Sequence, residues 1–86
     1  MRCYIIAEAA VLDGVGAMTV MQSAEQFGCQ TELVDAASPR GVQLATQYDL
    51  LARPVVVVTQ DDGSYVQHWD ALPSRDELAA VLARGV

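Results

Sequence analysis

The segment Arg2–Glu8 is rich in Tyr and Ile and has a charged residue at each end, and this composition is typical of a β-strand. From Ala17 to Phe27 the apolar residues recur every three or four positions, which predicts a helix with one buried face. Gly28 follows at once, where helices commonly end. We expect the intervening segment, Ala9–Gly16, to form a loop with a glycine-containing turn.

The middle of the chain repeats this strand–helix pattern. Gln30–Val34 alternates and predicts a second strand. Ser38 is a suitable N-cap for a second helix, and Pro39 occupies the first helical position, where a missing N–H costs nothing. The helical pattern extends to Tyr48 and ends before Arg53-Pro54, since proline breaks a helix.

The last third contains a strand pair and a helix. Val55–Val58 is apolar on both faces, as expected of a central strand covered on both sides. An Asp-Gly turn within Gln60–Ser64 predicts a hairpin to a partner strand at Tyr65–Trp69. Ser74 and Glu77 have the spacing of a capping box for a last helix.

The predicted order is therefore β-α-β-α-β-β-α in one α/β domain spanning residues 1–86. A helix connects the first two strands, so we expect them to be parallel with a right-handed crossover, whereas the last two form an antiparallel hairpin. The prediction is a mixed four-stranded sheet with helices on both faces.

This order and three local segments resemble the thioredoxin and glutaredoxin superfamily. Arg53-Pro54 before Val55–Val58 is similar to the family's X-Pro segment, in which the proline is cis. The segments Asp61–Val66 and Trp69–Ser74 resemble its hairpin and the stretch that precedes its last helix. The resemblance implies a thioredoxin-like fold over essentially the whole chain.

The sequence departs from the family at the redox motif. The segment that corresponds to the family's CxxC is about Gly14–Ala17, which contains no cysteine. Dithiol exchange requires an attacking thiolate and a nearby resolving thiol, and this loop supplies neither. Cys3 and Cys29 fall early in the first strand and at the start of the second, so we expect them to be buried together at the opposite end of the sheet.

Without the redox motif, the end of the sheet that holds the active site in the family could still provide a binding surface. Helix N-terminal amides attract anions and peptide carbonyls, and the family pairs the backbone before its cis-proline with an extended peptide. The predicted binding residues are those of the first loop and of the X-Pro segment: Asp13, Gly14, Val15, Gly16, Ala17, Arg53 and Pro54. The simpler interpretation, a tight turn beside a solvated arginine, remains open.

Composition narrows the possible partners and the compartment. Eleven acidic residues against five basic ones give a net charge of −6, which disfavours nucleic acid and anionic membrane surfaces. One histidine and two separated cysteines do not form a metal-binding pattern, and no short motif for a cofactor is present. The first apolar stretch is cut short by Glu8, unlike a signal peptide, so we expect a cytoplasmic protein.

Three functions are compatible with these residues. The first is a non-catalytic thioredoxin-like module that binds a protein or peptide, as a monomer or homodimer. The second is an enzyme, either a thiol oxidoreductase or a glutathione-handling glutaredoxin-like protein, that uses Cys3 or Cys29. The third is a regulatory module resembling the circadian-clock KaiB proteins, to which Leu51–Pro54 has a weak similarity.

Overall fold

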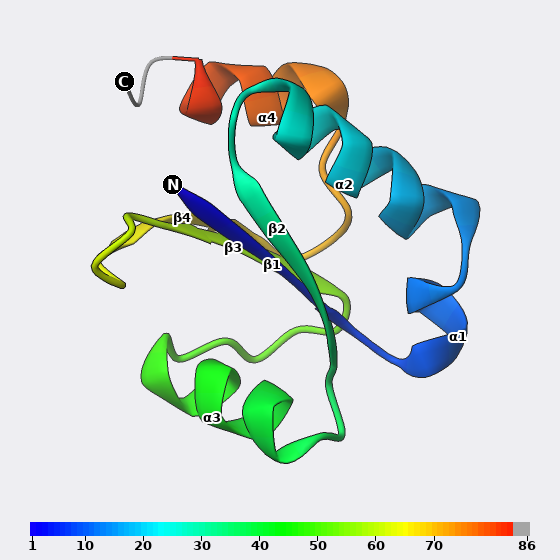
Figure 1. Cartoon of the computed structure of the whole chain (residues 1–86). Helices are drawn as coiled ribbons and strands as arrows, with labels where there is room; N and C mark the ends of the chain where they lie inside the picture. The colour runs from blue at the N-terminus through cyan, green and yellow to red at the C-terminus, as the bar shows by residue number, and fades with distance from the viewer. Residues whose placement is uncertain (84–86) are drawn as a thin grey trace.

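The computed structural model describes residues 1–83, which form four strands and four helices (Figure 1). In chain order these are β1 (Arg2–Ala7), α1 (Ala9–Leu12), α2 (Val15–Gln26), β2 (Gln30–Asp35), α3 (Pro39–Gln47), β3 (Val55–Thr59), β4 (Tyr65–Trp69) and α4 (Arg75–Leu82). Every strand predicted from the sequence is present, within a residue or two of its predicted bounds.

The strands form one mixed sheet in the order β2-β1-β3-β4. β1 runs parallel to β2 and antiparallel to β3, and β3 runs antiparallel to β4. β3 is thus one of the two central strands, and all five of its residues are buried. This confirms the prediction for Val55–Val58, because a strand paired on both edges and covered on both faces has no position left for a polar side chain.

Helices cover both faces of the sheet, with α2 and α4 on one side and α3 on the other (Figure 1). The strict alternation of β1 divides its side chains between two apolar clusters. Cys3 and Ile5 join the cluster beneath α2 and α4, whereas Tyr4 and Ile6 join the cluster beneath α3. The core is therefore two layers separated by the sheet, as the predicted fold class requires.

Side-chain caps start two of the helices where the sequence predicts them. The Ser38 hydroxyl accepts a hydrogen bond from the Gly41 N–H, and Pro39 follows at the first helical position. At α4, Ser74 accepts from the Glu77 N–H while the Glu77 carboxylate accepts from the Ser74 N–H, which completes a capping box. Each cap satisfies amides that the helix itself cannot pair.

A close backbone contact holds α3 against the turn that follows β2. Gly41 is buried, and a Cβ at this position would lie 2.3 Å from the Asp35 carbonyl oxygen and 3.0 Å from the Ala36 Cα. Only a residue without a side chain allows the helix to approach this turn so closely.

The segment before α2 differs from its prediction. Ala9–Leu12 forms a four-residue helix, α1, instead of a loop, and α2 begins at Val15 instead of Ala17. The apolar spacing used to locate α2 starts only at its first buried residue, Ala17, so the exposed first turn carries no hydrophobic signal. Gly14 adopts an extended conformation and separates the two helices.

Candidate functional site

Strand register brings the two parts of the predicted binding site to the same end of the sheet. Ile6 of β1 pairs with Val55 of β3, so Pro54 lies next to Ala7. At this end of the sheet β1 stops and the chain turns into α1 (Figure 1). The Arg53–Pro54 peptide bond is cis, as the resemblance implies. The loop that precedes β3 and the loop that precedes α2 therefore lie at the same end of the sheet.

The first part of the predicted site surrounds the N-terminus of α2. Gly14 is the N-cap and supplies no side-chain hydrogen bond, so the amides of the first turn remain open to an external acceptor. Asp13 is exposed and caps the C-terminal end of α1 instead of the start of α2. Val15 is 83% exposed, whereas Ala17 is buried in the core. Gly16 faces Leu72, whose Cδ1 would lie 3.0 Å from a Cβ placed there.

The second part of the predicted site is a groove between the Arg53 loop and α3. An open hollow of about 330 Å³ is lined by Arg53, Leu51, Leu50, Asp49 and the α3 residues Val42, Ala45 and Thr46. Leu51 is 91% exposed, although its neighbour Leu50 is buried. Leu51 could not be predicted as a binding residue, because nothing in the pair Leu50-Leu51 indicates which leucine enters the core.

The backbone before the cis-proline is available for pairing. Within residues 1–83, no hydrogen bond comes from the backbone N–H groups of Leu51, Ala52 or Arg53. Arg53 is exposed and takes part in none of the ion pairs found in that part of the chain. No hydrogen bond among these residues joins it to the Asp13–Ala17 segment. Arg53 lines the groove beside α3, whereas Gly16 faces Leu72.

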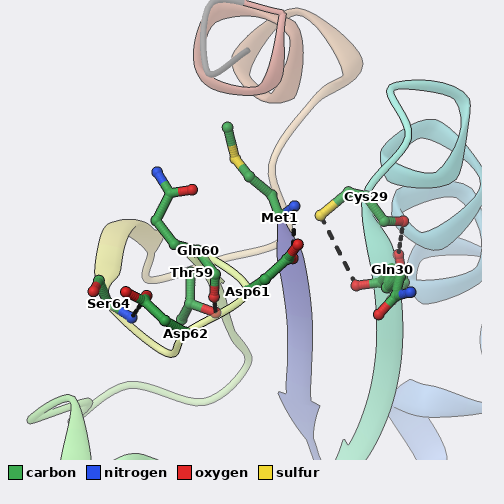
Figure 2. A network of polar contacts seen from close by, with 9 residues as sticks. Met1, Cys29, Gln30, Thr59, Gln60, Asp61, Asp62 and Ser64 are labelled. Carbon is green, nitrogen blue, oxygen red and sulfur yellow. Dashed lines mark hydrogen bonds and ion pairs between the residues drawn. The ribbon is translucent and has the colours of Figure 1, made fainter.

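The two cysteines lie at the other end of the sheet. Cys29 directly precedes β2, next to Met1, whose ammonium group lies 3.0 Å from the Asp61 carboxylate in the β3–β4 hairpin (Figure 2). Cys3 and Cys29 belong to the same apolar cluster, with 1% and 3% of their surfaces exposed. Both are free thiols. The expectation that they are buried together, away from the cis-proline, is confirmed.

The two thiols influence each other's ionisation. A hydrogen bond with Cys29, reinforced by burial, raises the pKa of Cys3 far above its usual range. The same hydrogen bond lowers the pKa of Cys29, although burial opposes this effect. Any thiolate of the pair therefore forms on Cys29, but its sulfur points into the molecule, within 3.9 Å of the Gln30 carbonyl oxygen (Figure 2). A substrate has no access to it without opening of the fold.

The single histidine, His68, has two side-chain partners. Its Nδ1 lies 2.7 Å from the Tyr65 hydroxyl and its Nε2 lies 3.3 Å from an Asp70 carboxylate oxygen. These groups adjoin an open pocket of about 420 Å³ at the C-terminal end of α3. The arrangement depends on a β-bulge in β4, which alternation of the sequence does not reveal.

Neither a metal site nor a membrane-spanning helix is found in the part of the chain that the structure describes. No group of three or more His, Cys, Asp or Glu side chains within residues 1–83 has an arrangement that would hold a metal ion. None of the helices there has the length and apolar character to cross a membrane.

Comparison with known proteins identifies the fold. No family model matches the chain, and no curated protein matches its sequence. Among solved structures, thioredoxin 1 from the thermophilic eubacterium Thermosipho africanus TCF52B superposes with a TM-score of 0.72. The match covers 99% of this chain and 93% of that one at 13% sequence identity, a level at which only the fold is comparable. With its mixed four-stranded sheet, helices on both faces and no CxxC before α2, the chain has a thioredoxin-like fold without the dithiol motif.

Proposed function

We propose that this domain binds a protein or peptide partner at the cis-proline end of the sheet and performs no dithiol exchange there. The observation that carries the proposal is the surface around Arg53-Pro54. Leu51 is almost fully exposed, Val42 is half exposed, and both line one groove with Arg53. Exposed apolar side chains gathered beside charged groups are typical of an interaction site.

The main chain of this loop supports binding of an extended segment. Three consecutive residues, Leu51 to Arg53, have backbone N–H groups that make no hydrogen bond within residues 1–83. An incoming strand would pair with such amides and place alternate side chains against Leu51 and Arg53. The guanidinium of Arg53 favours a carboxylate on the partner, because a charge-assisted hydrogen bond is stronger than a neutral one.

The positions of the cysteines support a role without redox chemistry. Cys3 and Cys29 are buried at the opposite end of the sheet, so neither thiol lies beside the proposed surface. Cytoplasmic localisation and the absence of a nucleic-acid or membrane partner remain part of the proposal, and the acidic composition supports the second of these.

Affinity capture with matched variants tests the proposal. The baits are the wild type, Leu51→Ser, Arg53→Gln, and the control Arg2→Gln, which removes an exposed arginine at the far end of the sheet. A true partner is retained by the wild type and the control and lost with the first two variants. In a titration, Arg53→Gln should weaken its binding by about 1–3 kcal/mol.

Two results contradict the proposal. One is a partner held equally by all four baits, which would mean that the cis-proline end is not used. The other is reduction of insulin or glutathione disulfide by the purified protein, with loss of that activity in Cys3→Ser or Cys29→Ser. The second result would support the thiol oxidoreductase alternative instead.

A further inference from the structure

The β4 edge of the sheet carries a pocket that the proposed function does not use. Its volume is about 420 Å³, and it is lined by the last residues of α3 and its cap together with two residues of β4: Gln47, Tyr48, Asp49, Tyr65 and His68. It shares only Asp49 with the groove beside Arg53. Tyr65 is 49% exposed, and its ring centre lies 6.4 Å from that of Tyr48.

A β-bulge brings the two β4 side chains together. Residues three apart on a regular strand point to opposite faces, so Tyr65 and His68 would be separated by the sheet. Here Thr59 pairs with Tyr65 while Val58 pairs with Gln67, which leaves Val66 as an extra residue. Tyr65 and His68 therefore lie opposite Thr59 and Val57, which share the face covered by α3, and their side chains meet.

The hydroxyl groups of Tyr48 and Tyr65 already take part in hydrogen bonds within the protein. The Tyr48 hydroxyl donates to the Gly63 carbonyl oxygen. The Nε2 of His68 lies 3.3 Å from an Asp70 carboxylate oxygen, and in the neutral tautomer that carries its proton on this nitrogen Nδ1 is the acceptor for the Tyr65 hydroxyl proton. Both phenol oxygens can then only accept. Together with the Asp49 carboxylate they present hydrogen-bond acceptors beside two π faces, and a ligand must bring the donors.

Asp49 is in a position that the helix alone does not favour. It follows the C-cap of α3 with φ = 56°, a left-handed conformation that glycine adopts most easily. Its carboxylate also adds negative charge to the negative end of the helix dipole, where the last turn has no basic residue. The backbone conformation and the charge of Asp49 are therefore both unfavourable for stability, which is common for residues with a function.

We infer that this pocket binds a guanidinium group, and this inference goes beyond the proposed function. A guanidinium is a planar, weakly hydrated cation that stacks on an aromatic ring and brings a fork of donors. Tyr65 supplies the exposed face, and Asp49 and the two phenol oxygens supply acceptors. No lysine or arginine side chain lines this pocket among residues 1–83, and the net charge of −6 favours a cation.

The test is an NMR titration of the ¹⁵N-labelled protein with N-acetyl-arginine amide. N-acetyl-citrulline amide is the control ligand, because it has nearly the same shape but no charge. We expect saturable shifts of the amides around Asp49, Tyr65 and His68 with the arginine compound, and at least tenfold weaker binding of citrulline. Agmatine in a parallel titration distinguishes the sources: tighter binding than the amide indicates a free guanidinium compound, and weaker binding indicates an arginine side chain of a protein.

Variants connect the binding to the named residues. Asp49→Asn keeps a residue that tolerates the left-handed conformation but removes the charge, so it should weaken arginine binding about fivefold while raising Tm by about 2–6 °C. Tyr65→Leu removes the stacking face and should weaken it at least as much. Glu25→Gln removes one exposed charge on the other side of the sheet and should leave arginine binding unchanged. Equal binding of citrulline, or equal affinity of Asp49→Asn and Glu25→Gln, would overturn the inference.

Discussion

Two helical glycines should respond in opposite ways to the same substitution. Gly41 of α3 and Gly16 of α2 both occupy helix positions, where alanine is favoured over glycine by about 1 kcal/mol. A Cβ at Gly41 would lie 2.3 Å from a backbone oxygen of the turn after β2, so α3 or the turn must move. A Cβ at Gly16 meets only the end of the Leu72 side chain at 3.0 Å, and that side chain can rotate away.

The magnitudes follow from these contacts. Overpacking in a close-packed interior costs roughly 1–3 kcal/mol and sometimes more, and backbone atoms cannot yield by changing rotamer. For Gly41→Ala we take the upper part of that range, offset by the gain in helix propensity, and expect a net loss of about 2 kcal/mol. In a domain of this size that lowers Tm by roughly 8–16 °C. For Gly16→Ala the two effects nearly cancel, and we expect a change within about 0.5 kcal/mol.

Urea denaturation followed by the fluorescence of the single Trp69 measures both variants on one scale. Gly41→Ala should reduce the midpoint concentration with an unchanged m-value, because the surface exposed on unfolding is the same. The reasoning is wrong if Gly41→Ala is as stable as the wild type, or if Gly16→Ala loses as much stability as Gly41→Ala. Either result would mean that the close approach of α3 to the Asp35–Ala36 turn does not limit this fold.

Three shorter predictions concern a helix cap, an ion pair and the buried thiols. Ser74→Ala removes the capping box of α4 and should cost about 1 kcal/mol in urea denaturation, and an unchanged midpoint would contradict the importance of this cap. The hydrogen bond from Arg40 lowers the pKa of Glu32, so this pair stabilises the fold above the ordinary pKa of glutamate, and the stabilisation is lost as the pH falls through the lowered value. Arg40→Gln should therefore raise the pKa of Glu32 in an NMR titration and make the protein less sensitive to acid over that range, and an unchanged Glu32 pKa would refute this. Cys3 and Cys29 should react with a disulfide reagent only at the rate of fold opening, and rapid labelling of either thiol in the native protein would show that it is accessible.

Most of the fold was predictable because each strand and helix carries its own hydrophobic period. Val55–Val58 is apolar throughout, and it is central and covered on both faces. Ser38 and Ser74 start helices through short-range hydrogen bonds that adjacent residues encode. Such features depend on residues that are close in the sequence, so they can be predicted from the pattern of residues along the chain.

The features that the sequence did not predict depend on residues distant along the chain. The bulge at Val66 exists because β4 pairs with β3 out of simple register, and only that pairing brings Tyr65 to His68. Leu51 is exposed because Leu50 occupies the space beneath α3. α1 was missed for a different reason: none of its four residues is fully buried, so no buried face marks it as a helix.

Because α1 has no fully buried residue, it should open locally more often than the central strands. Local opening costs little where few apolar contacts must be broken, whereas amides of paired central strands exchange only when the whole domain unfolds. The amides of β1 and β3 should thus be the slowest to exchange with deuterium, while α1 and the first turn of α2 exchange through separate small fluctuations. A ligand that engages this end would slow exchange there first, and the entropy lost in ordering α1 would lower its affinity without altering any direct contact.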